Sequence, residues 1–352
     1  MVESSKGVRA RIVRFTTRGL LVLVILCLVF AGAGAIWNAW TIHRELAAVG
    51  VPGKLYEVDG RKMHLYCTGD GSPTILLETG LGDDLLIWGK NQPELSKLTR
   101  VCSYDRAGFG WSEARPGIRD SDAISRELYG LVTQAAIAKP FILMGHSIAG
   151  IHMRAYAARH PEDVAGIVFI DGSTPRQDLR FPKELDREMN KYLLEMKFVK
   201  VADAVGLLRL MGQCNEVQPG FEAYAAWIKA DSCHPSQFTA FKRENAAVPA
   251  SGDEALHTGP FGNMPILIFS QDPDRAMAGL PEKLGREMSA DWNGMQEDLK
   301  KLSTRSRRII ANGSTHYVQV DRSELVNREV AKFLDEVRTG TSSPQNGTTI
   351  RE

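Results

Sequence analysis

Ser147 lies at the centre of segment 140–150, whose sequence predicts a buried strand, a sharp turn and a helix. Residues 141–144 are Phe, Ile, Leu and Met, an apolar run typical of a strand covered on both faces. The residues after Ser147 return to apolar positions at helical spacing. A serine on such a turn forms a nucleophile elbow, which exposes its hydroxyl to a reacting carbonyl. Three small residues leave room for the backbone to close around it: Gly145, Ala149 and Gly150.

The chemistry that this turn favours is acyl transfer. A serine hydroxyl is a poor nucleophile at neutral pH, so it needs a histidine to take its proton and a carboxylate to orient that histidine. The usual pattern is Gly-x-Ser-x-Gly, and here Ala149 takes the last position. Alanine is small enough to fit there. The motif alone is weak, and its strand and helix context gives it weight.

The elements around Ser147 alternate between strands and helices, which predicts a mostly parallel sheet with helices on both faces. Residues 175–258 hold long helical stretches without a clear strand, so we expect a helical cap inserted into the α/β core. The core then comprises residues 54–174 and 259–338, and residues 41–53 form a linker. The tail 339–352 has a composition typical of disorder. Strands are expected at 54–59 and 62–67, joined by a hairpin turn at Asp59-Gly60, and at 74–78, 100–104, 164–170, 265–269 and 307–311. A helix interrupted by Pro93 is expected up to about Leu98, and further helices are expected at 121–138, 185–205, 291–302 and 323–337.

The bulk composition narrows the class of protein. A chain of 352 residues with 43% hydrophobic content can bury one large core with an insertion. The net charge of +1, without a long block of one sign, gives no reason to expect a nucleic-acid partner. Neither a metal-binding Cys/His spacing nor a dinucleotide motif occurs, so we expect no metal and no cofactor.

The N-terminus predicts a membrane anchor. Residues 1–18 are basic, and residues 19–40 carry no acidic or basic side chain. That stretch is long enough to cross a hydrocarbon core, which needs about 20 residues. The positive flank places the N-terminus in the cytoplasm and the rest of the chain outside it. The alternative is a signal peptide cleaved near Ala33-Gly34-Ala35, which would leave a secreted or periplasmic protein. The flanking cations are Lys6, Arg9, Arg11, Arg14 and Arg18.

Three motifs in the same order resemble those of the α/β-hydrolase fold superfamily, in its cap-bearing branch of esterases and related hydrolases. They are Tyr104-Asp-Arg-Ala-Gly-Phe-Gly-Trp-Ser112, Gly145-His-Ser147-Ile-Ala149 and Gly313-Ser-Thr-His316. The resemblance covers roughly residues 54–338. It implies an eight-stranded, mostly parallel sheet, with the nucleophile after strand 5, the acid usually after strand 7 and a histidine after strand 8.

The resemblance assigns the catalytic side chains. Ser147 is the expected nucleophile, and His316 is the expected base because it alone among the histidines follows the last expected strand. For the acid we expect Asp272, which stands before a proline at the end of the strand at 265–269. Asp274 and Asp171 are the alternatives, the latter because some family members carry the acid after strand 6.

The resemblance also implies an oxyanion hole made by two backbone N–H groups. These are the N–H of Ile148, after the nucleophile, and that of Leu81, in the loop after strand 3. Many family members have His-Gly in that loop, where this chain has Thr79-Gly80. In this family the segment that holds Asp105 and Arg106 is structural, and we expect Arg106 to pair with a carboxylate.

The cysteines suit an oxidising compartment. In the resembled fold strand 2 runs antiparallel beside strand 4, which places Cys67 next to Cys102 at a distance that a disulfide can bridge. Export across the membrane would supply the oxidant. Cys214 and Cys233 could similarly link two parts of the cap.

The sequence therefore predicts a membrane-anchored serine hydrolase that cleaves a small or lipophilic carboxylic ester through an acyl-enzyme on Ser147. An aminopeptidase or an acyltransferase of the same fold is the nearest alternative. A ligand-binding receptor that kept the hydrolase constellation without activity is a third.

Overall fold

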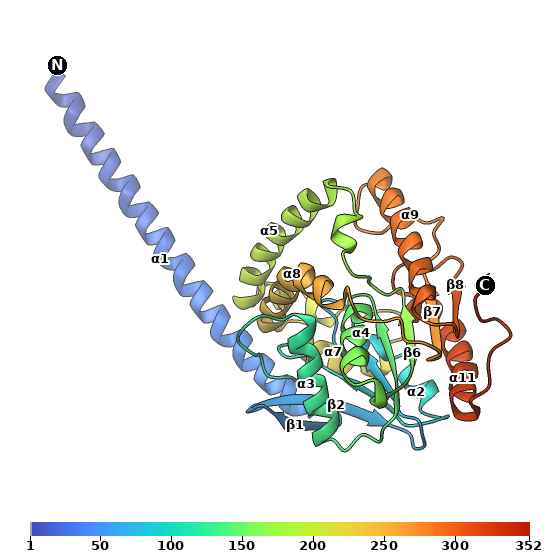
Figure 1. Ribbon diagram of the computed structural model, residues 1–352. Helices are drawn as coiled ribbons and strands as arrows, with labels where there is room; N and C mark the ends of the chain where they lie inside the picture. Colours follow the sequence, from blue (N-terminus) through green and yellow to red (C-terminus); the bar gives the residue numbers. More distant parts are fainter. Residues whose placement is uncertain (1) are drawn as a thin grey trace. The chain divides into compact units, whose positions relative to one another are not determined.

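The computed structural model describes residues 2–352, with side chains from residue 13 onward except that of residue 235 (Figure 1). The chain divides into two compact units. One contains α1 (Val2–Val49) together with residues 195–217 and 225–235. The other contains residues 51–194, 218–224 and 236–352, and it holds the sheet.

The sheet has nine strands in the order β1-β2-β4-β3-β5-β6-β7-β8-β9. Only β2 runs against its neighbours, so the sheet is mostly parallel as predicted. The strands are β1 (Lys54–Val58), β2 (Arg61–Thr68), β3 (Ile75–Glu78), β4 (Val101–Tyr104), β5 (Phe141–His146), β6 (Val164–Ile170), β7 (Ile266–Ser270), β8 (Ser306–Ile310) and β9 (Thr349–Arg351).

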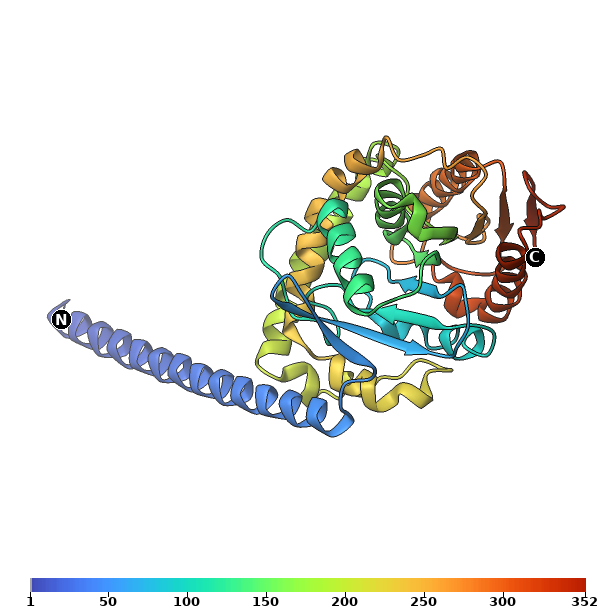
Figure 2. The same cartoon turned by 60° about the horizontal axis from the view of Figure 1, so that its bottom comes forward.

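Helices cover both faces of the sheet (Figure 2). One face packs on α3 (Ser121–Gln134) and α4 (Ala149–Arg159), with the end of α9 (Glu282–Leu299). The other packs on α2 (Gln92–Leu95) and α11 (Ser323–Thr339). Successive residues of each central strand join opposite cores, which explains why these strands are continuous apolar runs rather than alternating ones.

Two helical segments of the core differ from the sequence-based expectation. The helix expected up to Leu98 is two short pieces, η1 (Leu85–Trp88) and α2. Helix α9 begins directly after Pro281, about one-half of its length earlier than expected, because that proline precedes its first turn. The remaining short elements in this unit are η2 (Pro161–Asp163), η3 (Gln177–Leu179), η5 (Glu222–Tyr224), η6 (Lys300–Leu302) and α10 (Val318–Asp321).

The C-terminal tail contains a strand, although its composition predicts disorder. Residues expected to be disordered form β9, which pairs parallel to β8 and adds a ninth strand to the eight predicted. The Arg351 side chain donates to Asp272 at 2.7 Å and to Asp274 at 2.5 Å. Backbone pairing and these charged hydrogen bonds hold a segment whose residue types alone favour disorder.

The region expected to form the cap contains helices, and its residues are divided between the two units. It contains α5 (Glu184–Ala204), α6 (Leu207–Leu210), η4 (Gln213–Asn215), α7 (Ala225–Asp231) and α8 (Pro235–Ala255). Part of it, residues 195–217 and 225–235, groups with α1.

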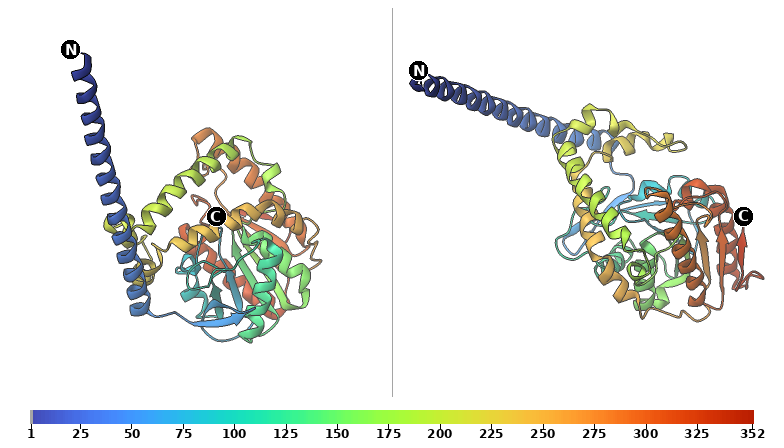
Figure 3. Two further views of the ribbon diagram at one scale, coloured as in Figure 1. Left: turned by 90° about the vertical axis from the view of Figure 1, so that its left-hand side faces the viewer. Right: turned by 90° about the horizontal axis from the view of Figure 1, so that it is seen from above.

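Helix α1 is one unbroken helix in Figure 3 and is long and apolar enough to cross a membrane. The residues expected to form a linker continue this helix as far as Val49, because no glycine or proline interrupts them before Gly50. Gly50 has a φ of +67°, a conformation that ends helices.

Both expected disulfides are present. Cys67 of β2 lies opposite Cys102 of β4, with a Cα–Cα distance of 4.0 Å. Cys214 and Cys233 are joined with a Cα–Cα distance of 5.5 Å. The first bridge confirms the predicted order of strands 2 and 4.

Candidate active site

Ser147 sits between β5 and α4 with a φ of +56°. A side chain at Gly145 would place its Cβ 2.6 Å from the Cβ of Ala149, and one at Gly150 would come 2.7 Å from the backbone oxygen of Ser173. Glycine is therefore a steric requirement at both positions. Ala149 fits at the last position of the motif because its neighbour across the turn is Gly145.

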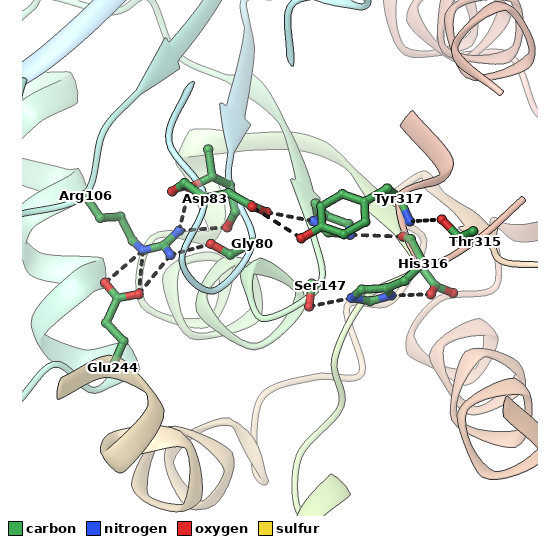
Figure 4. Close-up of polar contacts among 11 residues, drawn as sticks. Gly80, Asp83, Arg106, Ser147, Glu244, Thr315, His316 and Tyr317 are labelled. Atoms are coloured by element: carbon green, nitrogen blue, oxygen red, sulfur yellow. Dashed lines mark hydrogen bonds and ion pairs between the residues drawn. The ribbon is translucent and has the colours of Figure 1, made fainter. Parts of the chain in front are cut away.

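His316 connects Ser147 to a buried carboxylate (Figure 4). Its Nε2 lies 2.9 Å from the Ser147 Oγ, and its Nδ1 lies 2.6 Å from the Asp171 Oδ2. The tautomer that satisfies both contacts donates its Nδ1–H to Asp171 and accepts the serine proton at Nε2. Asp171 is fully buried directly after β6, and its other oxygen accepts the Gln271 N–H at 3.0 Å.

Asp272, the acid expected from the sequence, does not contact His316. Its carboxylate accepts the N–H groups of Gly313 at 2.8 Å and Asp274 at 3.0 Å, as well as the Arg351 guanidinium. Burial acts to raise the pKa of Asp272, but these hydrogen bonds outweigh it and the pKa is lowered. Asp274 contacts Arg351. The sequence-based choice of partner for His316 is therefore wrong, and Asp171, the alternative, occupies that position.

The order of the strands explains this correction. β6 is the neighbour of β5, which carries Ser147, whereas β7 lies one strand farther away. Asp171 leaves β6 immediately, with a φ of +46°, and so points its side chain at the edge where the serine stands. The proline after Asp272 is therefore not a mark of the residue that contacts His316. The useful signal was Asp171-Gly172 directly after the buried strand that precedes the cap.

The two expected oxyanion-hole residues, Leu81 and Ile148, line the same pocket as Ser147 and His316. The loop that carries Leu81 is held by Arg106, which donates to the backbone oxygens of Thr79 at 2.7 Å and Gly80 at 2.8 Å (Figure 4). The buried Arg106 also pairs with Glu244 of α8 at 2.8 Å, which confirms the expected carboxylate partner. Arg106 thus links the loop to a cap helix.

Asp105 has a structural role, as expected. It is buried and accepts the N–H groups of Leu85 at 2.9 Å and Trp111 at 3.1 Å. Its carboxylate also lies 2.7 Å from the His64 Nδ1. These contacts join η1 to the loop after β4 and leave Asp105 without a contact to Ser147 or His316 among the interactions described.

His146 supports His316 through the backbone, a role that the sequence did not reveal. Its Nε2 donates to the backbone oxygen of His316 at 3.0 Å, and its Nδ1 lies 3.4 Å from Asp83 (Figure 4). The Tyr317 hydroxyl contacts the same aspartate at 3.4 Å. Burial lowers the pKa of His146, which favours its neutral form beside His316.

A pocket of about 440 Å³ opens at Ser147. Its lining is mostly apolar, and among the described residues that form it none is a lysine or an arginine. Its apolar lining comprises Leu81, Ile148, Phe181, Leu185, Met189, Val248, Pro249, Met277, Ala278, Leu280, Met288 and Trp292. The part of the chain that the structure describes contains no cluster of three or more histidine, cysteine or acidic side chains that could hold a metal.

A family model for the alpha/beta hydrolase fold matches residues 73–323. The chain belongs to the alpha/beta hydrolase fold family. Membership agrees with the sheet order, with the serine after β5 and with the histidine after β8.

Two curated relatives and one solved structure illustrate the likeness. The chain is 29% identical over 165 residues to the uncharacterized protein YbdG of Bacillus subtilis (strain 168), covering 46% of this chain and 49% of that one. It is 26% identical over 301 residues to the 2-hydroxy-6-oxononadienedioate/2-hydroxy-6-oxononatrienedioate hydrolase of Paraburkholderia xenovorans (strain LB400), covering 80% and 93%. The enol-lactonase from Burkholderia xenovorans LB400 has a similar structure, with 20% identity, a TM-score of 0.55 and coverage of 80% and 100%. The matches span only 49% and 57% of the first two curated relatives.

The stability of the folded protein should depend on pH through the buried carboxyl of Glu78. Glu78 is the last residue of β3, next to the loop that Arg106 holds, and burial raises its pKa to about 8 despite the attraction of Arg106. In the unfolded chain the carboxyl ionises near 4.5. Its contribution to stability is therefore fully present below about pH 4.5 and is lost as the pH rises through about 8.

We expect Glu78→Gln to flatten the fall in melting temperature between about pH 5 and about pH 9, because glutamine stays neutral. The matched control is Glu94→Gln, at an exposed side chain of α2. Thermal unfolding across this range measures both variants. If the melting temperature of Glu78→Gln falls with pH as steeply as that of the wild type and the control, Glu78 is not a buried, protonated carboxyl.

Proposed function

We propose that this protein is a serine hydrolase that cleaves a carboxylic ester through an acyl-enzyme on Ser147. The observation that carries the proposal is the continuous hydrogen-bonded series from the Ser147 hydroxyl through His316 to the buried Asp171. A serine that only stabilised a turn would not need a histidine aligned with a buried carboxylate.

The proposed reaction proceeds in two halves. In the first, the Ser147 Oγ attacks the ester carbonyl while its proton passes to the His316 Nε2, and Asp171 stabilises the imidazolium. The carbonyl oxygen becomes an oxyanion that accepts hydrogen bonds from the N–H groups of Leu81 and Ile148. Collapse breaks the ester bond, and the departing alkoxide takes the proton from His316. In the second half, water attacks the acyl-enzyme and gives a proton to His316. Collapse breaks the bond between the acyl carbon and the Ser147 Oγ, which takes the proton from His316 as the acid leaves.

The pocket supports a neutral, lipophilic acyl or alcohol group. Its apolar lining favours hydrocarbon, and among the described lining residues there is no lysine or arginine to pair with a substrate carboxylate. The proposed location is the membrane, with α1 as a single span and the catalytic unit outside the cytoplasm. The apolar α1 and the two disulfides support this location.

Ser147→Ala should lower kcat for ester hydrolysis by about 10³-fold or more, because the attacking atom is removed. His316→Ala should lower it by a similar factor. The double variant should be no worse than either single one, since the two groups act as a unit. Turnover of a chromogenic ester and labelling by a fluorophosphonate probe measure the loss. A Ser147→Ala variant with a few per cent of wild-type turnover removes Ser147 from the mechanism.

Asp171→Asn should lower kcat by about 10³-fold or more with little change in KM, because asparagine favours the wrong histidine tautomer. Asp272→Asn, at the carboxylate that binds the Gly313 N–H, is the matched comparison and should lower kcat at least tenfold less. Steady-state kinetics on both variants ranks them. The reverse ranking would return the acid to Asp272.

A substrate panel separates the proposed esterase from the other functions that the fold permits. We expect neutral esters with apolar acyl chains to be cleaved with a higher kcat/KM than esters that carry a carboxylate, because the pocket offers no cation to pair with it. Aminoacyl amides test for an aminopeptidase, and an added alcohol as acceptor tests for an acyltransferase. Preference for the carboxylate-bearing esters contradicts the substrate class. A folded protein that neither reacts with the probe nor cleaves any member is a binding protein.

A further inference from the structure

Six large apolar side chains of the cap are exposed in the described part of the unit that contains α1, and five of them are more than 40% exposed. Phe198 is 71% exposed and Leu210 is 75% exposed, values unusual for such side chains in a water-facing position. Phe198 and Val201 of α5 are three residues apart, and so are Leu207 and Leu210 of α6, which places each pair on the same side of its helix. We call Phe198, Val201, Leu207, Leu210 and Met211 the apolar patch.

The backbone between the two halves of the patch packs directly on α1. A Cβ at Gly34 would lie 2.3 Å from the backbone oxygen of Val205, so the two backbone segments are in direct contact there. A Cβ at Gly206 would similarly lie 3.1 Å from the ring of Trp37. Val205 and Gly206, which join the two halves of the patch, therefore lie beside residues 34–37 of α1, at the outer end of the apolar stretch 19–40.

A buried polar cluster fixes this arrangement. The Asn38 amide donates to the backbone oxygen of Asp203 at 2.7 Å, and the Arg209 guanidinium donates to Asn38 at 2.9 Å and to Glu45 at 2.5 Å. Arg209 and Asn38 are both buried, so the charge is paired inside the unit. The exposed apolar side chains can therefore face hydrocarbon without drawing an unpaired charge with them.

The position along α1 sets the depth in a membrane. Gly34 follows Gly19, the first residue after the last flanking cation, by 15 residues. At about 1.5 Å per residue this is about 22 Å, inside a hydrocarbon core of about 30 Å. Asn38 lies at about 28 Å, near the outer boundary of that core. A tilt of α1 would shorten its rise and carry both residues deeper.

We propose that the apolar patch is immersed in the outer leaflet of the bilayer that α1 spans, at the boundary between hydrocarbon and headgroups. The proposal rests on α1 as a membrane span and goes beyond it, because a single anchor alone would leave the cap in water. Its contact with lipid covers side chains that are otherwise exposed. Lys197, which is exposed beside Phe198, suits an anionic headgroup at the same level.

The test measures lipid contact at single positions of the full chain. In a Cys27→Ser background, Leu210→Cys and Phe198→Cys are each labelled with an environment-sensitive fluorophore. The protein is reconstituted in vesicles of phosphatidylcholine and phosphatidylglycerol that contain lipids with a spin label near the headgroup. Ile118→Cys, an equally exposed apolar position of the sheet-bearing unit, is the control in water. Leu23→Cys, within α1, is the control in lipid.

We expect roughly twofold or greater fractional quenching at positions 210 and 198 relative to position 118. Quenching at position 23 with none above the control at 210 and 198 overturns the proposal while leaving α1 as a span. The proposal is then overturned whether the patch lies in water or is covered by a second copy of the chain. Disulfide-linked dimers of unlabelled Leu210→Cys would reveal the second copy. Absence of quenching at position 23 overturns the span and the patch together. Unchanged melting temperatures of the labelled variants exclude unfolding as the cause.

Discussion

The left-handed backbone of Ser147 is the constraint on which the site depends. A residue with φ of +56° between β5 and α4 forces the chain through a turn so tight that Gly145 and Gly150 have no space for a side chain. The segment after β6 closes this turn, since the Ser173 N–H donates to the backbone carbonyl oxygen of Ser147 at 2.8 Å. That contact joins the segment after β6 to Ser147. The carboxylate of Asp171, two residues before Ser173, is thereby fixed close to the site by the same backbone closure that exposes the serine.

Arg106 and His146 fix the positions of two further parts of the site, the loop that carries Leu81 and the backbone at His316. Arg106 is a fully buried cation whose donors are divided between the loop of Leu81 and the carboxylate of Glu244. Burial of a paired charge is tolerable only when its hydrogen bonds are satisfied, so the loop and the cap helix are held to one geometry. His146 holds the backbone at His316 by donating a hydrogen bond to its carbonyl oxygen. The loop of Leu81 and the backbone at His316 are therefore positioned by Arg106 and His146, which lie outside the series Ser147–His316–Asp171.

The sequence predicts correctly those elements that depend on residues close together in the chain. The apolar run before Ser147, the small residues around it and the turn at Asp59-Gly60 have local causes, and the structure has β5, α4 and the β1–β2 hairpin where expected. The partner of His316 has no local cause. Asp171, Asp272 and Asp274 all follow strands, and only the order of β5, β6 and β7 decides which carboxylate faces the serine. β9 was missed for the same reason, because its pairing with β8 and the contacts of Arg351 are long-range.

The position of Asp171 assigns Asp272 a different task. His316 follows β8, yet its ring must reach back past β7 to meet a carboxylate at the end of β6 and a serine at the end of β5. A loop that crosses this distance needs an anchor. Asp272, at the end of the intervening strand β7, accepts the N–H of Gly313 three residues before His316, while Arg351 of β9 pairs with the other carboxylate oxygen. The lowered pKa keeps that carboxylate ionised, which strengthens both hydrogen bonds. The two aspartates therefore divide the work, one orienting the histidine ring and the other holding the loop that carries it.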